Sequence, residues 1–339
     1  MNPHAPRTLD GETFVGQGDF TYRVVPDWPQ LPDGWSFGEA VAMATDSTGR
    51  VYVFNRGEHQ TIVFAADGQF LTSWGEGDFV RPHGLVIDAH DIIFCADDFD
   101  HTVHKCTLEG ERLMTLGVSG QPADTGASTT DYRDIVRVGP PFNFPTNIAF
   151  GAAGELYVSD GYGNARIHVF SAEGELLRSW GEPGSGPGQF HLPHGIAVTA
   201  DGTVVVADRE NSRLQFFSPE GEFLKEWTEI ARPCQVHIDE AGFFYIAEVG
   251  YKAGMYSGVE PPTPNATGGR VSIFSPDGEL QSRWGGGDDP CAPGDFFAPH
   301  DIWVDAAGAV YVSEVTLSAG GNRGLVSPDC HTVQKFERC

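Results

Sequence analysis

Basic residues are scarce in this sequence. Lysine and arginine together number 21 against 47 aspartates and glutamates, which gives a formal net charge of −26 over 339 residues. A chain with this charge balance repels both the phosphate backbone of a nucleic acid and an anionic membrane surface. We therefore expect neither nucleic acid nor a membrane as a partner.

Long apolar runs are also missing. No stretch approaches the roughly 20 apolar residues that a membrane-spanning helix needs, and residues 1–19 contain no run typical of a secretory signal. We expect a soluble, cytoplasmic protein, whose oligomeric state the sequence does not predict.

Cysteine motifs that bind metals are absent as well. The six cysteines include no C-x-x-C pair and no other metal-ligand spacing. In a cytoplasmic protein, reduced and mostly structural thiols are the expected default. The alternatives are a disulfide bond between Cys95 and Cys106 or one between Cys291 and Cys330, and the sequence leaves open whether either forms.

What the sequence does contain is an internal repeat. Each unit has an apolar-x-Pro start, a β-rich run that ends in Asp, and a close similar to F-S-x-x-G-E-x-L-x-x-W-G. The six units span 37–75, 79–117, 142–181, 190–228, 231–285 and 296–339. A period near 40 residues with about four short strands per unit is typical of propeller blades. We therefore predict an all-β fold, a six-bladed β-propeller.

The fourth unit shows the expected strands clearly. Short β-branched or aromatic runs lie at 195–199, 203–207, 214–218 and 223–227. Each run is bounded by turn residues such as Asp-Gly or Pro-Glu-Gly, as expected for an antiparallel meander.

The two ends of the chain are predicted to meet in one blade. The sixth unit ends after its third strand, at 332–338, whereas the stretch 22–28 resembles a strand and has no blade of its own. Because an unpaired strand edge is a liability, we predict that this N-terminal strand completes the last blade. The expected organisation is an N-terminal extension over 1–20 and a single catalytic propeller domain over 21–339.

A Pro-His motif recurs in every second unit. It places His83, His194 and His300 at intervals of 111 and 106 residues, about twice the repeat. The other three units hold Val41, Thr146 and Cys234 at this position. Histidines on alternate blades of a closed ring would converge on its axis, and three imidazoles with an open fourth position are typical of catalytic zinc. We therefore predict a zinc site made of the three histidines.

Further polar loop residues are expected near the histidines. In an antiparallel meander, the loop after the second strand lies on the same face as the connection that enters the first strand. Those loops contain Arg56, His59, Tyr162 and Arg209. A guanidinium suits a carboxylate and lowers the pKa of a nearby phenol, so that the tyrosine can act as a general base. The groups suit bond cleavage in an anionic substrate.

Three long insertions are predicted on the same face, at 118–141, 249–270 and 315–331. One decorated face on a rigid scaffold is typical of a binding site. The segment 249–270 is rich in Gly and Pro and is a candidate lid over the metal.

On these residues the chain resembles the peptidyl-α-hydroxyglycine α-amidating lyases, which are zinc enzymes with NHL repeats on a six-bladed propeller. The resemblance runs from about Val41 to Phe336 and is most specific at 54–59, 158–162, 188–194, 206–211 and 299–302. It implies a zinc-dependent carbon–nitrogen lyase that cleaves a peptide-like N-acyl α-hydroxyglycine to a primary amide and glyoxylate. Another enzyme must supply this hydroxylated substrate.

The resemblance also implies roles for individual residues. The three histidines would bind zinc, Tyr162 would be the base, and Arg56 and Arg209 would hold the substrate and stabilise its charge. A structural calcium would be bound by the carboxylate of Asp301 and the backbone carbonyls of Met43 and Leu85.

Some positions depart from the family's pattern. The family has a methionine two residues before the last zinc histidine, where this chain has Ala298, so we expect a differently shaped pocket. The candidate pocket residues are Ala298, Cys234, Thr146 and His59. Disulfide positions of the family are occupied here by Phe144, Gly163, Val205 and Phe216, in agreement with a reducing compartment.

Three other interpretations stay open, because a fold does not fix a function. The same propeller could carry another zinc-dependent lyase, hydratase or hydrolase that acts on a small hydroxy-carboxylate. A calcium-dependent lactonase would need carboxylate and amide oxygens rather than three imidazoles. A non-catalytic propeller that binds a protein partner would not explain the alternation of the histidines.

Overall fold

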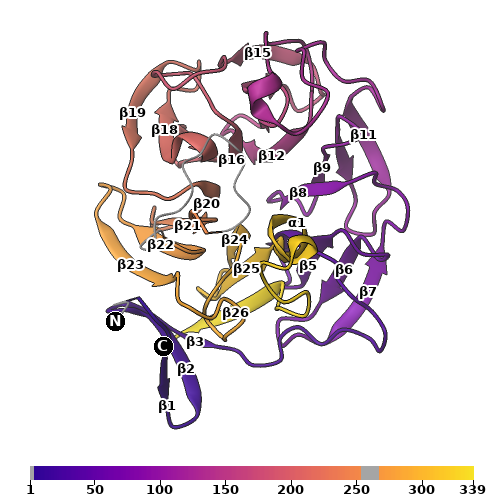
Figure 1. Ribbon diagram of the computed structural model, residues 1–339. Helices are drawn as coiled ribbons and strands as arrows, with labels where there is room; N and C mark the ends of the chain where they lie inside the picture. Colours follow the sequence, from indigo (N-terminus) through magenta and orange to yellow (C-terminus); the bar gives the residue numbers. More distant parts are fainter. Residues whose placement is uncertain (1–3, 253–266) are drawn as a thin grey trace. The chain divides into compact units, whose positions relative to one another are not determined.

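The structure, a computed structural model, describes residues 4–252 and 267–339. It is a six-bladed β-propeller with five four-stranded sheets and one six-stranded sheet (Figure 1), which confirms the predicted fold class. The chain divides into two compact units, Met1–Ser73 with His237–Cys339 and Trp74–Val236. Residues 253–266 of the predicted lid lie outside the described residues.

The unit Trp74–Val236 contains three complete antiparallel meanders. The first sheet consists of β8 (Pro82–Ile87), β9 (Ile93–Asp97), β10 (Thr102–Cys106) and β11 (Arg112–Gly117). The second consists of β12 (Pro145–Phe150), β13 (Leu156–Asp160), β14 (Arg166–Phe170) and β15 (Leu176–Trp180), and the third of β16 (Pro193–Val198), β17 (Val204–Asp208), β18 (Arg213–Phe217) and β19 (Phe223–Trp227). The strands predicted for the fourth repeat agree with β16 to β19 within two residues.

The inner strands of this unit are buried on both faces. Every residue of β13 and β17 is buried, whereas the outer strands β15 and β19 contain no buried residue. Ile167 and Val169 of one sheet pack with Val204 and Val206 of the next. A strand that is covered on both sides needs a continuous apolar run, which is why the repeat carries one at this place.

The unit formed by Met1–Ser73 and His237–Cys339 contains the remaining strands. One sheet has β4 (Ala40–Thr45), β5 (Val51–Asn55), β6 (Thr61–Phe64) and β7 (Phe70–Trp74), and another has β20 (Pro233–Ile238), β21 (Phe244–Glu248), β22 (Arg270–Phe274) and β23 (Leu280–Gly285). Strands β7 and β20 each cross a boundary between the units. The six-stranded sheet combines β24 (Pro299–Val304), β25 (Val310–Glu314) and β26 (Val333–Arg338) with β1 (Arg7–Leu9), β2 (Glu12–Gln17) and β3 (Phe20–Val24).

The N-terminal strand lies slightly earlier than predicted. Strand β3 pairs antiparallel with β26, and Val24 lies opposite Phe336. Part of the predicted extension over 1–20 is itself structured, because β1 and β2 continue the same sheet beyond β3. The sixth sheet therefore has two strands more than the repeat requires.

A disulfide bond joins Cys291 and Cys330, whose Cα atoms are 5.0 Å apart. The expectation of reduced thiols is therefore wrong for this pair. Cys291 precedes β24 and Cys330 precedes β26, so that only the folded chain brings them together. Disulfide bonds persist in oxidising compartments, so cysteine usage no longer supports a cytoplasmic location. The other cysteines, Cys95, Cys106, Cys234 and Cys339, are free thiols.

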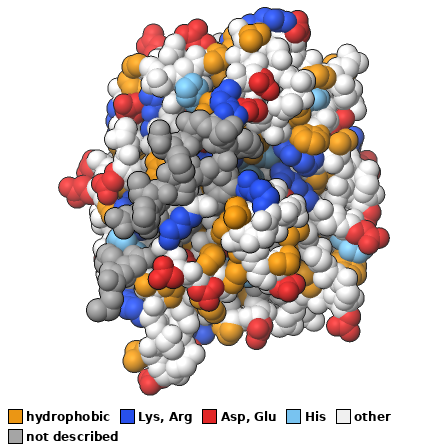
Figure 2. All heavy atoms as spheres, in the orientation of Figure 1, with side chains coloured by type: hydrophobic (Ala, Val, Ile, Leu, Met, Phe, Trp, Pro, Cys, Tyr) orange, Lys and Arg blue, Asp and Glu red, His pale blue; other side chains and the backbone are white. Residues whose placement is uncertain are grey.

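Within residues 4–252 and 267–339, helical structure is limited to short segments. They are α1 (Thr316–Ala319) and the 3₁₀ turns η1 (Tyr132–Asp134), η2 (Arg209–Asn211) and η3 (Gly321–Arg323). Among the described residues, no helix is both long and apolar enough to cross a bilayer. Figure 2 shows acidic and basic side chains interspersed with hydrophobic ones on the visible surface.

Candidate active site

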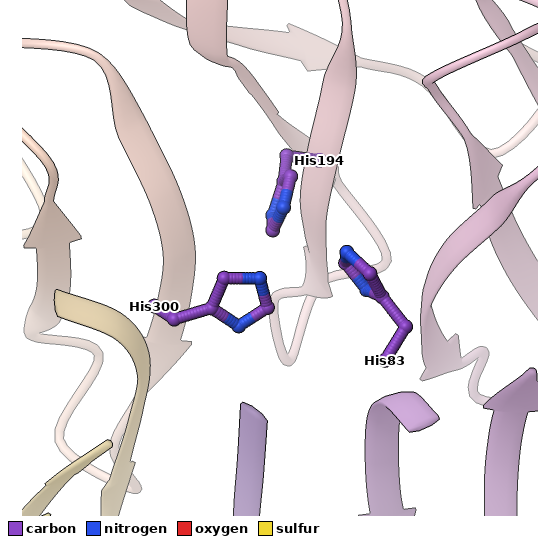
Figure 3. Close-up of side chains that lie close together, drawn as sticks. All are labelled: His83, His194 and His300. Atoms are coloured by element: carbon purple, nitrogen blue, oxygen red, sulfur yellow. The ribbon is translucent and has the colours of Figure 1, made fainter. Parts of the chain in front are cut away.

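The three histidines of the Pro-His motifs occupy equivalent places. Each is the second residue of a first strand, in β8, β16 and β24, and each is buried. Among the described residues, His83, His194 and His300 are one of two groups whose ligand atoms lie close enough together to hold a metal ion (Figure 3). Within the unit Trp74–Val236, the ring centroids of His83 and His194 are 4.8 Å apart.

Each histidine ring is oriented by a backbone carbonyl. His83 Nδ1 lies 2.8 Å from the oxygen of Thr146, and His194 Nδ1 lies 2.9 Å from the oxygen of Cys234. In the other unit, His300 Nδ1 lies 2.7 Å from the oxygen of Val41. A carbonyl oxygen only accepts hydrogen bonds, so Nδ1 carries the proton in each ring. The lone pair of Nε2 then faces away from the carbonyl and suits a metal ion.

The three carbonyls explain the alternation of residues along the repeat. Val41, Thr146 and Cys234 are the residues that replace histidine in the other three repeats. Since the backbone makes the contact, the side chain at these positions is free to differ. Thr146 Oγ1 donates a hydrogen bond of 3.0 Å to the carbonyl of Ser159, and burial raises the pKa of the Cys234 thiol.

Tyr162 lies beside two of the histidines. Its Oη is 3.3 Å from His83 Nε2 and 3.2 Å from His194 Nε2, and Arg209 Nη1 donates to the same oxygen over 3.3 Å. The phenol group can donate its proton to one Nε2 at a time while it accepts from the guanidinium. The structure therefore brings four of the predicted site residues together within one unit.

Apolar side chains surround the tyrosine. Tyr162 is buried in a cluster with Phe144 and Leu192, and Tyr132 packs against this cluster. Tyr132 belongs to the insertion 118–141, which therefore lies beside the site as the repeat alignment predicts. Such a wall excludes water and strengthens the electrostatic contacts of Tyr162 with its neighbours.

Arg209 is held by a glutamate that the sequence analysis did not single out. Arg209 Nε donates to Glu210 Oε1 over 2.9 Å. The same carboxylate accepts two hydrogen bonds from Arg232, from Nη2 to Oε1 over 2.9 Å and from Nε to Oε2 over 3.1 Å. Burial alone would raise the pKa of Glu210, but the charges of Arg209 and Arg232 lower it below its ordinary value. Glu210 is therefore an ionised carboxylate in the fold.

Arg56, in the other unit, is also paired with a glutamate. Its Nη1 donates to Glu39 Oε2 over 2.8 Å, and Glu39 Oε1 accepts from the amide of Ser318 over 2.5 Å. Glu39 immediately precedes β4, and Ser318 belongs to α1 in the insertion 315–331. His59, another predicted pocket residue, stacks on Trp35 with ring centroids 3.4 Å apart.

Carboxylates at the ends of the second strands fix the chain before each histidine. Asp97 of β9 accepts from the amide of Arg81 over 2.9 Å, and Asp208 of β17 accepts from the amide of His191 over 2.8 Å. In the other unit, Glu314 of β25 accepts from the amide of Ala298 over 2.9 Å. The acidic residue is visible in the sequence of these three repeats. The backbone amide that donates to it is known only from the folded structure.

The residues proposed for calcium lie in both units. Asp301 follows His300 in β24 and is buried, and its Oδ2 accepts a hydrogen bond of 2.6 Å from the amide of Met43. Leu85 lies in β8 of the other unit. Ala298, the predicted pocket residue, is completely buried, as is Thr146.

A second group of side chains could hold a cation by geometry alone, namely Asp97, Asp100 and His104. Hydrogen bonds within the blade account for it. His104 bonds to the hydroxyls of Thr102 and Thr115, and Asp100 accepts from Thr102. We therefore treat this group as structural.

Known proteins support the repeat and the fold. The NHL repeat family matches residues 142–170 and 190–217. The chain is 30% identical over 230 residues to peptidylglycine alpha-amidating monooxygenase of Rattus norvegicus, which covers 57% of this chain and 22% of that protein. It is 26% identical over 328 residues to peptidyl-alpha-hydroxyglycine alpha-amidating lyase 2 of Drosophila melanogaster, which covers 88% of this chain and 74% of that protein. The chain spans less than a quarter of the length of the amidating monooxygenases that it matches.

Solved structures agree on the architecture. A gluconolactonase of Xanthomonas campestris superposes with a TM-score of 0.60 at 12% identity, over 99% of this chain and 97% of that chain. A virginiamycin B lyase from Staphylococcus aureus gives 0.54 at 13% identity, over 99% and 94%. At these identities the likeness shows the fold alone. The chain is therefore a six-bladed propeller with NHL repeats and with homologues named as amidating lyases, which support an enzyme.

Proposed function

We propose that this protein is a zinc-dependent lyase that cleaves an N-acyl α-hydroxyglycine to a primary amide and glyoxylate. The observation that carries the proposal is the position of Tyr162 Oη, within hydrogen-bonding distance of His83 Nε2, His194 Nε2 and Arg209 Nη1. The homologues named as amidating lyases support a peptide-like substrate.

We propose that His300 joins His83 and His194 as the third zinc ligand. The same tautomer in all three rings supports this, because each Nδ1 meets a carbonyl and each Nε2 keeps a lone pair. When bound, zinc supplies Lewis acidity toward a hydroxyl or carboxylate oxygen of the substrate. The donor set of three imidazoles matches catalytic zinc better than calcium or magnesium.

The proposed reaction needs one proton removed and one returned. In its phenolate form, which the cationic Arg209 favours, Tyr162 takes the proton of the substrate's α-hydroxyl group. The oxygen of that group then forms the carbonyl of glyoxylate as the carbon–nitrogen bond breaks. The electron pair of that bond passes to the amide nitrogen, which gains a proton from Tyr162 or from water. Arg209 and Arg56 bind the substrate's carboxylate and stabilise the charge that develops.

We also retain the calcium as part of the proposal, with Asp301 and the carbonyls of Met43 and Leu85 as ligands. The support is the chemistry of Asp301, a buried carboxylate next to a zinc ligand. Carboxylate and carbonyl oxygens are the ligands that calcium prefers. The calcium would have a structural role and takes no part in the steps above.

The second candidate is another zinc-dependent lyase, hydratase or hydrolase for a small hydroxy-carboxylate. The Tyr162–Arg209 contact favours an anionic substrate with an acidic hydroxyl group, and it does not by itself specify a carbon–nitrogen bond. The two candidates differ in their products, because only the first releases an amide together with glyoxylate.

The test is to incubate the purified zinc-loaded protein with α-hydroxyhippurate and to measure benzamide and glyoxylate. Equal amounts of both products above the spontaneous rate support the proposal. Zinc at about one ion per chain without either product rejects the lyase and favours the second candidate. A folded protein that neither binds zinc nor releases glyoxylate rejects both.

A further inference from the structure

Two arginines share one buried glutamate beside the candidate base. The side chain of Glu210 exposes 0% of its surface, and that of Arg232 exposes 2%. Arg232 donates to both oxygens of Glu210, and Arg209 Nε donates to Oε1. Arg209, Arg232 and Glu210 together carry one net positive charge. Without Arg232, the pair of Arg209 and Glu210 would have a net charge of zero.

The planar guanidinium of Arg209 contacts both Glu210 and Tyr162. Its Nε donates to Glu210, and its Nη1 donates to Tyr162 Oη. Since a guanidinium is rigid, a partner that fixes the Nε edge also fixes the direction of Nη1. Glu210 is fixed in turn by Arg232 and by its own amide, which donates to the carbonyl of His191 over 2.9 Å.

The backbone conformation of Arg232 does not by itself require an arginine. Arg232 has a φ of 55°, in the left-handed region, and precedes Pro233 at the start of β20. The equivalent residues before Pro145 and Pro193 have the same conformation, with φ of 64° at Phe144 and 69° at Leu192. The turn therefore accepts an apolar residue, and the repeat geometry does not require an arginine.

We propose that Glu210 and Arg232 are positioning residues for Arg209. Glu210 directs Nη1 of Arg209 toward Tyr162, and Arg232 supplies the second cation that prevents Glu210 from neutralising Arg209. The inference rests on the proposed function for its catalytic consequence. It assigns a role to two residues in different repeats, and it explains why a buried charged triad lies beside Tyr162.

A double-mutant cycle tests the proposal. Glu210→Gln and Arg232→Leu are each expected to lower kcat/KM for α-hydroxyhippurate about tenfold or more, at unchanged zinc content. Arg232→Leu introduces the residue that the chain already uses at the equivalent position 192. In an Arg209→Leu background, each substitution is expected to change kcat/KM less than about twofold. Equal losses in both backgrounds would show that the pair acts independently of Arg209, and would overturn the proposal.

A matched control comes from the other unit. Glu248 is also fully buried and binds Arg270, with Arg270 Nη2 2.7 Å from its Oε2. Glu248→Gln is expected to lower thermal stability and to leave kcat/KM of the folded enzyme unchanged. A loss of kcat/KM in this control as large as that in Glu210→Gln would assign the effect to buried carboxylates in general, and would overturn the specific role of Glu210.

Crystal structures of the Glu210→Gln and Arg232→Leu variants test the positioning of Arg209 independently of activity. In Glu210→Gln and in Arg232→Leu, Arg209 Nη1 is expected to move out of hydrogen-bonding distance of Tyr162 Oη. An unchanged contact in both variants overturns the positioning role. If the wild type releases no glyoxylate, the proposed function fails, and these structures still test the geometry.

Discussion

Arg209 donates a hydrogen bond from Nη1 to the phenol oxygen of Tyr162 over 3.3 Å. This contact joins the turn after β17 to the turn after β13, two loops that lie 47 residues apart along the chain. It gives the phenol oxygen a cationic neighbour, while His83 and His194 also lie within hydrogen-bonding distance of that oxygen. The contact therefore combines a candidate base, a charge-stabilising group and two candidate metal ligands.

Removal of the phenol oxygen is expected to abolish most of the activity. Tyr162→Phe keeps the ring in the cluster with Phe144 and Leu192, so the fold and the zinc content should be retained. A general base contributes about 10²–10⁴-fold, and we expect kcat to fall by that order with a smaller change in KM. Steady-state kinetics on α-hydroxyhippurate measure both constants. Activity within about threefold of wild type would remove Tyr162 from the role of base.

Substitution of a histidine of the Pro-His motifs is expected to lower the zinc content, whereas substitution of another buried histidine is not. His83→Ala, His194→Ala and His300→Ala should each lower zinc far below one ion per chain, since the three imidazoles act together. His104→Gln is the matched control, because it is buried in β10 where the third repeat of the same unit has Gln215 in β18. Metal analysis of the purified variants gives the result. Full zinc in any alanine variant, or loss of zinc in His104→Gln, would contradict the assignment.

The repeat made the fold and part of the site predictable. Strand positions followed from short apolar runs bounded by turn residues, and the Pro-His motif followed from its return in every second repeat. The acidic residue that ends the second strand in five of the six repeats was also visible, and Asn55 takes its place in the first repeat. Each of these features has a fixed place within its repeat, so that one sequence is enough to align it.

Contacts between repeats were not predictable in the same way. Glu210 and Arg232 lie in different repeats, and the charge at these two positions does not recur regularly from repeat to repeat. The carbonyls that orient the histidines belong to the backbone, which leaves no signal in the side chains at 41, 146 and 234. The disulfide bond joins two irregular segments, where no periodicity exists to align them.

Removal of the disulfide bond is expected to lower stability without a change in the site. The bond closes a segment of 39 residues, and loop closure of that size corresponds to about 2–4 kcal/mol. The double variant Cys291→Ser, Cys330→Ser should therefore have a lower unfolding midpoint than the wild type. A reductant should lower the midpoint of the wild type to the same value. Cys339→Ser, at an exposed free thiol, is the control and should change neither. A wild type that is insensitive to reductant would contradict the presence of the bond.

Acid is expected to destabilise the fold partly through His104. Burial, followed by the charge of Arg112, lowers the pKa of His104 to about 4 from 6.5, although Asp100 opposes the change. Between these two pH values the unfolded chain binds the proton and the folded chain does not, so stability falls as the pH falls from 6.5 to 4. For this single group the loss is on the order of 3 kcal/mol. His104→Gln lacks the titrating group, so its free energy of unfolding in urea should fall less than that of wild type between pH 7 and pH 4. Parallel pH profiles of the two proteins would show that His104 is protonated as readily in the fold as in the unfolded chain.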